Sequence, residues 1–220
     1  LAAAAGLPAA AVETRCVNGL DFLLVERYDR RHPTPAAVER LHQEDFCQAL
    51  GIVPEQKYQK EGGPSLKRCF ALLRDVSSAP VIDLARLLDA VIFNYLAGNN
   101  DAHGKNFSFV YYGAGEDRQT RLAPLYDIVS TIYYPELSPD MAMRIGDQYS
   151  SENVTPKDFE QLAADARLAK PLVRARLLEM TERVLAAIPK VPAPNTVSGQ
   201  VANLIRRRCE TAANRFRTRR

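Results

Sequence analysis

One short polar segment of the sequence carries the residue types that phosphoryl transfer needs. It reads "NNDAHGKNFSFVYY" from Asn99 to Tyr112 and holds Asp101 and Asn106 five positions apart. Phosphoryl transfer uses a carboxylate to orient the attacking hydroxyl, and hard oxygen ligands for a divalent metal ion that bridges the phosphates. Protein kinases place a catalytic aspartate and a metal-binding asparagine at this separation, in the loop that follows a buried helix.

A second aspartate follows in the order that this chemistry requires. After "FSFVYY", a turn and "RLAPL", the segment "YDI" contains Asp127. We expect Asp101 to orient the hydroxyl, and Asn106 and Asp127 to hold the metal ion. His103 can brace the loop, and Lys105 can neutralise charge on the γ-phosphate. This order favours phosphotransfer over a capped polar turn, and over a zinc site, for which the spacing of the histidines offers no partner ligands.

The elements predicted around this segment are mostly helical. The run "VIDLARLLDAVIFNYLAGN" before it predicts a helix buried nearly all round, because its polar residues form a narrow stripe. Asn18-Gly19 predicts a β-hairpin over residues 11–29, and "FSFVYY" and "TRLAPLYDI" predict two further strands. The remaining predictions are a helix end at 1–5, helices at 34–51, 65–74, from 155, 171–187 and 196–216, and loops at 54–65 and 136–153.

Composition and charge narrow the class of protein. The chain has 220 residues, of which 46% are hydrophobic and 25% charged, as is typical of a globular protein with a core. Its net charge of +3 is too small to indicate a nucleic-acid partner by itself. No segment is long and apolar enough to span a membrane. The four cysteines are widely spaced, which predicts buried free thiols in a reducing compartment.

The basic residues concentrate at the end of the chain. The segment "IRRRCETAANRFRTRR" contains seven arginines and one glutamate. We expect a helix with a solvated or partly ion-paired face. The alternative is contact with a phosphate backbone or an acidic partner, which would weaken steeply with salt.

Several blocks of the sequence resemble the HipA family, the kinase toxins of bacterial toxin–antitoxin pairs. The blocks are "LLVERYDR", "LHQEDFCQALGIVPEQKYQKEGGPS", "NNDAHGKNFSF", "PLYDIVS" and "MAMRIG", in the family's order. The resemblance implies an α+β, protein-kinase-like fold. Residues 1–30 would end the N-lobe and form the interlobe hinge, and 31–220 would form a mostly helical C-lobe. It also implies transfer of the ATP γ-phosphate, with Mg2+, to a serine or threonine of a protein such as an aminoacyl-tRNA synthetase.

The resemblance assigns roles residue by residue. Asp101 matches the catalytic aspartate, and Asn106 and Asp127 match the magnesium ligands. The segment that joins the lobes, with Glu26, Arg27 and Tyr28, would contact adenine through its backbone. An exposed ion pair on a strand end is the alternative for Glu26 and Arg27. The nucleotide-contacting positions that the resemblance implies are Glu26, Arg27, Tyr28, His103, Gly104, Lys105, Asn106, Tyr126 and Asp127.

The resemblance also implies partners. A HipB-like helix-turn-helix antitoxin would restrain the kinase in the bacterial cytoplasm and bring it to operator DNA, with no membrane partner. The family's glycine-rich loop and phosphate-pairing lysine would precede Leu1, so we expect this chain alone to be a weak or inactive kinase. Two other functions stay open: a small-molecule or lipid kinase on a related fold, and a catalytically silent module that binds an antitoxin or DNA.

Overall fold

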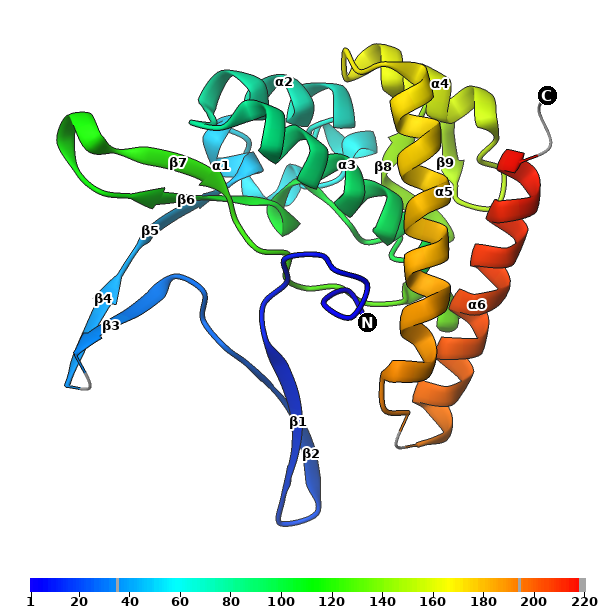
Figure 1. Ribbon diagram of the computed structural model, residues 1–220, viewed down its shortest axis with the longest axis horizontal. Coiled ribbons are helices and arrows are strands. Elements are labelled where there is room, and N and C mark those ends of the chain that lie inside the picture. Colours follow the sequence, from blue (N-terminus) through cyan, green and yellow to red (C-terminus); the bar gives the residue numbers. More distant parts are fainter. Residues whose placement is uncertain (35, 194, 218–220) are drawn as a thin grey trace.

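The computed structural model of the chain describes residues 1–34, 36–193 and 195–217. A helical body carries a three-stranded sheet on one side, and two β-hairpins project from it (Figure 1). The helices are α1 (Phe46–Ala49), α2 (Leu66–Val76), α3 (Pro80–Ala97), α4 (Pro156–Asp165), α5 (Lys170–Ala187) and α6 (Thr196–Arg217). The strands are β1 (Val12–Val17), β2 (Leu20–Val25), β3 (Arg30–Thr34), β4 (Ala37–Arg40), β5 (His42–Asp45), β6 (Ser108–Tyr112), β7 (Gln119–Leu122), β8 (Asp140–Ile145) and β9 (Gln148–Ser150).

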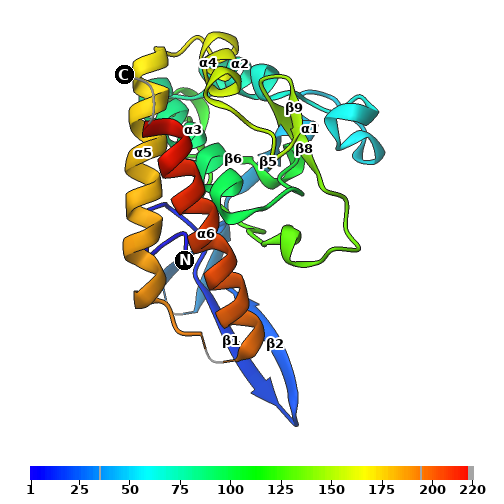
Figure 2. The same cartoon turned by 90° about the vertical axis from the view of Figure 1, so that its right-hand side faces the viewer.

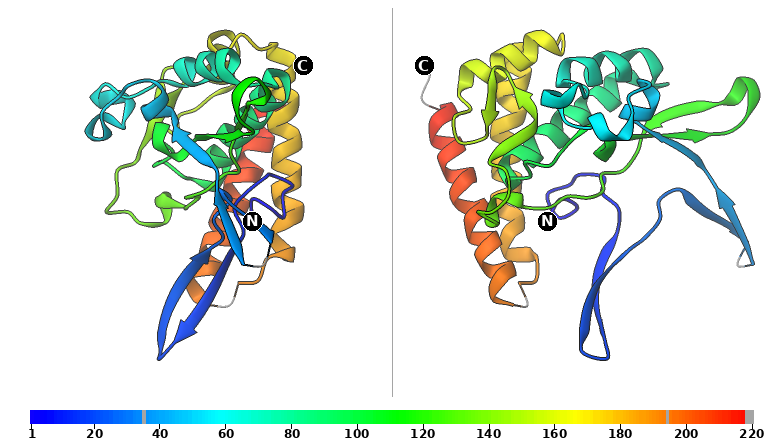
Figure 3. Two further views of the ribbon diagram at one scale, coloured as in Figure 1. Left: turned by 90° about the vertical axis from the view of Figure 1, so that its left-hand side faces the viewer. Right: turned by 180° about the vertical axis from the view of Figure 1, so that it is seen from behind.

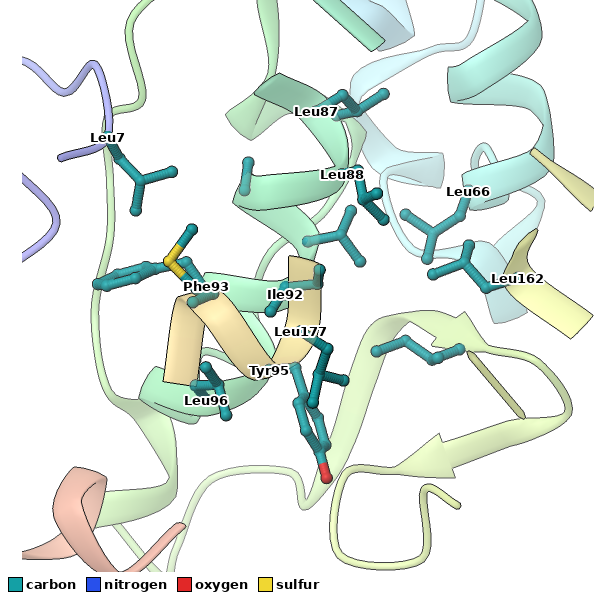
Figure 4. Close-up of a cluster of buried hydrophobic side chains, with 14 of the residues drawn as sticks. Leu7, Leu66, Leu87, Leu88, Ile92, Phe93, Tyr95, Leu96, Leu162 and Leu177 are labelled. Carbon is teal, nitrogen blue, oxygen red and sulfur yellow. The ribbon is translucent and has the colours of Figure 1, made fainter. Parts of the chain in front are cut away.

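Helix α3 is the centre of the body and confirms the predicted buried helix. It begins at Pro80, whose missing N–H costs nothing in a first helical turn. It ends at Gly98, where φ is +70° and glycine alone adopts the turn cheaply. Figure 4 shows its apolar side chains meeting those of other elements. The labelled members of this cluster are Leu7, Leu66, Leu87, Leu88, Ile92, Phe93, Tyr95, Leu96, Leu162 and Leu177.

Helices α5 and α6 form an antiparallel pair that covers one side of α3 (Figure 2). The basic segment predicted at the end of the chain lies on α6. Arg208 donates to the carbonyl oxygen of Tyr95 at 2.8 Å, and Arg217 pairs with Glu182 at 2.8 Å. These two arginines are therefore committed to contacts within the body. Arg219 and Arg220 lie outside the described residues.

A buried carboxylate ties α3 to the sheet. The side chain of Asp83 is fully buried and accepts from Arg121 Nε at 3.0 Å, Ser77 Oγ at 2.7 Å and Leu122 N at 3.0 Å. Burial acts to raise the pKa of Asp83, but these hydrogen bonds and the charge of Arg121 outweigh it, so the pKa is lowered. The ionised form of Asp83 is therefore the form that holds β7 against α3.

The sheet β5-β6-β7 positions the polar segment identified from the sequence. Strand β6 pairs antiparallel with both neighbours, in a register that places Asp45 opposite Ser108 and Phe109 opposite Leu122. The polar segment runs directly into β6, and the chain leaves β7 toward Asp127. The β6–β7 hairpin therefore returns the chain to the place where it left α3.

Three predicted elements were wrong. The helix expected at 34–51 is mostly strand: β4 and β5 occupy 37–40 and 42–45, and only α1 is helical. Strand β5 pairs with β6, a non-local contact that overrides a local helical pattern. The side chain of Asp45 then accepts from Gln48 N at 2.9 Å and caps α1, which fixes where that helix begins.

The loop expected at 136–153 contains the antiparallel hairpin β8–β9. Its residues Met141, Ala142 and Met143 are buried against the body, so packing stabilises a hairpin that the turn-rich sequence obscured. The helix end expected at 1–5 is instead a turn, closed by a hydrogen bond of 2.9 Å from Ala5 N to Leu1 O.

Of the other predicted elements, the strand expected over "TRLAPLYDI" is shorter, because β7 ends at Leu122. The rest were confirmed, including the hairpin β1–β2, whose turn residues Asn18 and Gly19 both have positive φ. Strand pairing joins β1 to β2 residue by residue, and the hairpin projects away from the body in each view (Figure 3). Thr155 begins α4 as expected, with its N–H donating to Asp158 at 2.8 Å. The division of the chain into lobes at residue 30 remains a prediction.

All four cysteines are free thiols: Cys16 is exposed, and Cys47, Cys69 and Cys209 are buried. Burial raises the pKa of Cys69 to about 12, so that thiol stays protonated and behaves as an apolar core group. Within the described residues, none of the helices is long and apolar enough to cross a membrane.

Candidate active site

The loop after α3 is fixed to the body by Asn100. Its backbone N–H donates to Thr131 Oγ1 at 2.8 Å, and its side chain donates to the carbonyl oxygen of Pro139 at 2.9 Å. Its carbonyl oxygen accepts from Ala142 N at 2.7 Å. Asn100 precedes Asp101, so these hydrogen bonds fix the backbone from which the side chain of Asp101 extends.

The two predicted metal ligands lie in contact. Asn106, in the short 3-10 helix η3 (Gly104–Asn106), donates from Nδ2 to Asp127 Oδ2 at 2.8 Å. Its Oδ1 accepts from His103 N at 2.9 Å, which fixes the side chain. Asp127 has φ of +54°, in the left-handed region that aspartate tolerates better than most residues. The two ligands, 21 positions apart in the sequence, thus come together in one site.

The side-chain types of this pair fit magnesium, although it is the amide nitrogen of Asn106 that faces Asp127 here. An amide oxygen and a carboxylate are hard oxygen ligands, and Mg2+ keeps several waters and phosphate oxygens beside one or two protein ligands. Among the described residues, no group of three or more His, Cys, Asp or Glu side chains could hold a metal ion by itself. The residues present therefore suit an ion that arrives with a nucleotide.

The carboxylate of Asp101 is hydrogen-bonded by Tyr58 and lies near His103. Tyr58 donates its phenolic hydroxyl to Asp101 Oδ1 at 2.8 Å. His103 Nε2 lies 3.9 Å from Asp101 Oδ2, and the rings of Tyr58 and His103 meet edge to face at 5.6 Å. The side chain of Asp101 is still 41% exposed, so a ligand can reach it. Tyr58 lies between the 3-10 helices η1 (Pro54–Gln56) and η2 (Gln59–Glu61).

His103 is buried beside this carboxylate and has an unsatisfied ring nitrogen. The residue is 5% exposed, and its Nδ1 has no hydrogen-bond partner. Burial lowers the pKa of His103, although the charge of Asp101 opposes that shift, so the neutral imidazole is favoured. A buried nitrogen without a partner is costly.

Lys57 adds a positive charge to the site. Burial acts to lower the pKa of Lys57, but its contact with Tyr58 and the charges of Asp101 and Asp127 outweigh burial and raise it. Its Nζ lies 4.8 Å from the centre of the Tyr58 ring. The protonated lysine therefore lies in the field of the carboxylates of Asp101 and Asp127.

Two stacked tyrosines connect the predicted hinge to the loop. The rings of Tyr28 and Tyr126 lie 5.8 Å apart at 29°. Tyr126 donates to the carbonyl oxygen of Lys105 at 2.6 Å, and Tyr28 donates to Gln43 Oε1 at 2.5 Å. Burial raises the pKa of Tyr28 to about 12, which keeps the hydroxyl protonated as a donor.

Most of the predicted site residues contact one another, whereas Glu26 and Arg27 make no hydrogen bond or ion pair with the rest among the described residues. Glu26 and Arg27 have exposed side chains, and Arg27 forms a bidentate pair with Asp29 at 2.7 and 2.8 Å. The N–H of Glu26 already donates to Ala11 O at 2.9 Å. Their predicted contact with adenine remains a prediction, as do the other individual roles.

Gly104 is fixed by packing under the loop. A Cβ at this position would lie 2.5 Å from Pro64 Cγ and 2.8 Å from Cys47 Sγ, closer than side-chain atoms approach. Any larger residue would therefore push the loop, with Asn106, away from the body.

Sequence reasoning missed Lys57, Tyr58 and Gln43 as neighbours of the site. Lys57 and Tyr58 belong to a polar segment that was expected to be a plain loop. Gln43 falls in the helix predicted at 34–51, whereas it lies on β5 and accepts from Tyr28. A lysine and a tyrosine adjacent to each other before "GGP" were the available signal.

The fold and the order of these residues define a kinase-like protein. A kinase from Helicobacter pylori, the proinflammatory CtkA, matches 98% of this chain and 82% of its own with a TM-score of 0.61 at 12% identity, a similarity of fold alone. A HipA chain from the Shewanella oneidensis toxin–antitoxin complex of HipA, HipB and operator DNA matches 98% of this chain and 54% of its own, with a TM-score of 0.89 and 27% identity.

The family follows from the sequence comparison. The model of the HipA-like C-terminal domain matches residues 1–190, so the chain belongs to the HipA-like family. The putative kinase Y4mE of Sinorhizobium fredii is 50% identical over 191 residues, which cover 87% of this chain and 44% of that protein. The serine/threonine-protein kinase toxin HipA of Shewanella oneidensis is 31% identical over 203 residues, which cover 87% of this chain and 46% of that toxin. The chain thus spans about half the length of these relatives.

Proposed function

We propose that this chain is the catalytic part of a protein kinase that transfers the ATP γ-phosphate to a serine or threonine hydroxyl. The observation that carries the proposal is the contact between Asn106 and Asp127 at 2.8 Å, with Asp101 in the same loop. These three side chains are the set that kinases use to bind metal and orient the acceptor. An acceptor in translation, such as an aminoacyl-tRNA synthetase, is part of the proposal.

The residues take the following roles. Tyr58 holds Oδ1 of Asp101, so Oδ2 is the atom that accepts the proton of the acceptor hydroxyl. Asn106 and Asp127 hold Mg2+, which when bound neutralises charge on the phosphates. Lys57 and Lys105 supply positive charge near the γ-phosphate, and His103 Nδ1 meets a ligand oxygen.

The whole protein would add what these 220 residues do not carry. Because the chain matches 44% and 46% of its two sequence relatives, we propose that a glycine-rich loop and a phosphate-pairing lysine come from further sequence. The chain alone would then bind ATP weakly and react slowly. Since the HipA neighbour was solved with HipB and operator DNA, we propose a HipB-like antitoxin as partner, with DNA contact through it, in the bacterial cytoplasm.

The test compares aspartates inside and outside the site. The full-length protein is incubated with γ-labelled ATP, Mg2+ and a bacterial lysate, and label is followed in proteins and in extractable small molecules. Asp101→Asn and Asp127→Ala should each lower protein labelling by about 10²–10⁴-fold. Asp117→Ala, at an exposed position in the β6–β7 turn, is the matched control and should act like the wild type.

Three results would contradict the proposal. Label found only in small molecules would indicate a small-molecule or lipid kinase. Equal labelling by all variants would show that the three side chains do not form the active site. Absence of label, together with unchanged toxicity of the Asp101 and Asp127 variants in cells, would indicate a silent binding module.

A further inference from the structure

A cavity of about 430 Å³ opens on one side of Asp101. Asp101 and Tyr58 border it, whereas the proposed metal ligands Asn106 and Asp127 do not line it. Asp101 therefore belongs both to the loop that carries Asn106 and to the wall of this cavity. That is the position an acceptor hydroxyl would have to reach in order to be oriented by the carboxylate.

The charges of this cavity argue against a nucleotide. Three acidic residues line it, Glu61, Asp101 and Asp140, and among the residues that the structure describes Lys60 is the only basic one in the lining. Lys60 is already paired with Asp140 at 2.5 Å and lies over the ring of Tyr149 at 4.4 Å. The negative charge of this lining would repel a triphosphate, whereas it would not repel a neutral group and would attract a cationic one.

The other residues that line the cavity suit a polypeptide acceptor. Leu137, Met141 and Ala142 supply apolar surface, and Leu137 is 47% exposed to solvent. Thr131 and Ser138 add hydroxyl groups. Apolar surface with a few polar groups and a negative rim suits an extended segment with small, neutral or basic side chains.

We propose that this cavity binds the acceptor segment of the protein substrate, and that Glu61 and Asp140 disfavour acidic residues beside the phosphorylated hydroxyl. The inference rests on the proposed kinase function. In the reaction the acceptor oxygen forms a bond to the γ-phosphorus, and the bond from that phosphorus to the β,γ-bridging oxygen breaks. ADP leaves, and the hydroxyl proton passes to Asp101.

The experiment measures acceptor preference. The full-length protein, ATP and Mg2+ are supplied with two synthetic peptide sets, each with one serine, flanked by lysine and arginine in one set and by aspartate and glutamate in the other. The wild type should phosphorylate the basic set with a kcat/KM at least about tenfold higher, about 1.4 kcal/mol in preference. Glu61→Lys should remove that preference and leave the KM for ATP unchanged.

The matched control is Glu55→Lys, six positions earlier, at an exposed residue that does not line the cavity. It makes the same charge change and should keep the preference of the wild type. The proposal is overturned if Glu61→Lys and Glu55→Lys behave alike, or if neither peptide set is labelled by a protein that labels lysate proteins. Failure of the kinase function itself looks different, because the wild type would then label no protein at all.

Discussion

The hairpin β1–β2 and the helix α3 are both rich in apolar residues, yet their environments are opposite. Leu88 on α3 is 1% exposed, whereas Leu24 and Leu20 on the hairpin are 42% and 73% exposed. Every residue of β1 and β2 is exposed. A two-stranded hairpin without a packed face is marginally stable in water. The comparison teaches that apolar composition alone does not make a core.

The difference bears on how the site is held. The loop with Asp101 and Asn106 begins at the end of α3 and is bonded to the body through Asn100. The predicted hinge residues Glu26 and Arg27 follow directly from the exposed hairpin. The positions of the proposed catalytic side chains therefore depend on the body, and the free energy of unfolding should depend on the two regions very unequally.

The largest effect is expected at Leu88. Leu88→Ala removes a fully enclosed side chain and leaves a cavity in the core, which should lower the free energy of unfolding by about 3 kcal/mol. Urea titration followed by circular dichroism measures this change. A loss below about 1 kcal/mol would mean that the core around α3 relaxes easily and does not hold the loop rigidly.

A smaller effect is expected at Asp83, which joins α3 to β7. Asp83→Asn keeps the shape but leaves Arg121 without its charged partner, which should lower the free energy of unfolding at neutral pH by about 2 kcal/mol. Asp21→Asn on the exposed strand β2 is the matched control and should have little effect.

The effect of Asp83→Asn should depend on pH. The pKa of Asp83 is lowered in the folded protein, so its contribution is present above the unfolded pKa and is lost as pH falls through the folded pKa. The difference between wild type and variant should therefore shrink in acid. A difference that stays constant from neutral to acidic pH would show that the ionised carboxylate is not what joins α3 to the sheet.

The sequence predicted the body better than the β elements, for a physical reason. The helix α3 and the cap at Thr155 follow from local patterns. Strand β5 depends on pairing with β6, which lies far along the chain, and the local hairpin β8–β9 depends on packing against the body. No local sequence pattern contains either interaction. The same limit applies at the site. Asp101, Asn106 and Asp127 could be chosen by their order, but Tyr58 meets Asp101 across 43 residues of sequence.

The smallest effect is expected on the hairpin. Leu20→Thr replaces a side chain that is 73% exposed with a β-branched residue that suits a strand, and should change the free energy of unfolding by less than about 0.5 kcal/mol. The same urea titration checks it beside Leu88→Ala. Binding of an apolar-surface dye to the folded variant should fall, because the exposed apolar area decreases. A loss above about 1.5 kcal/mol would mean that Leu20 packs against another surface in solution, and the hairpin would then belong to a core, as α3 does.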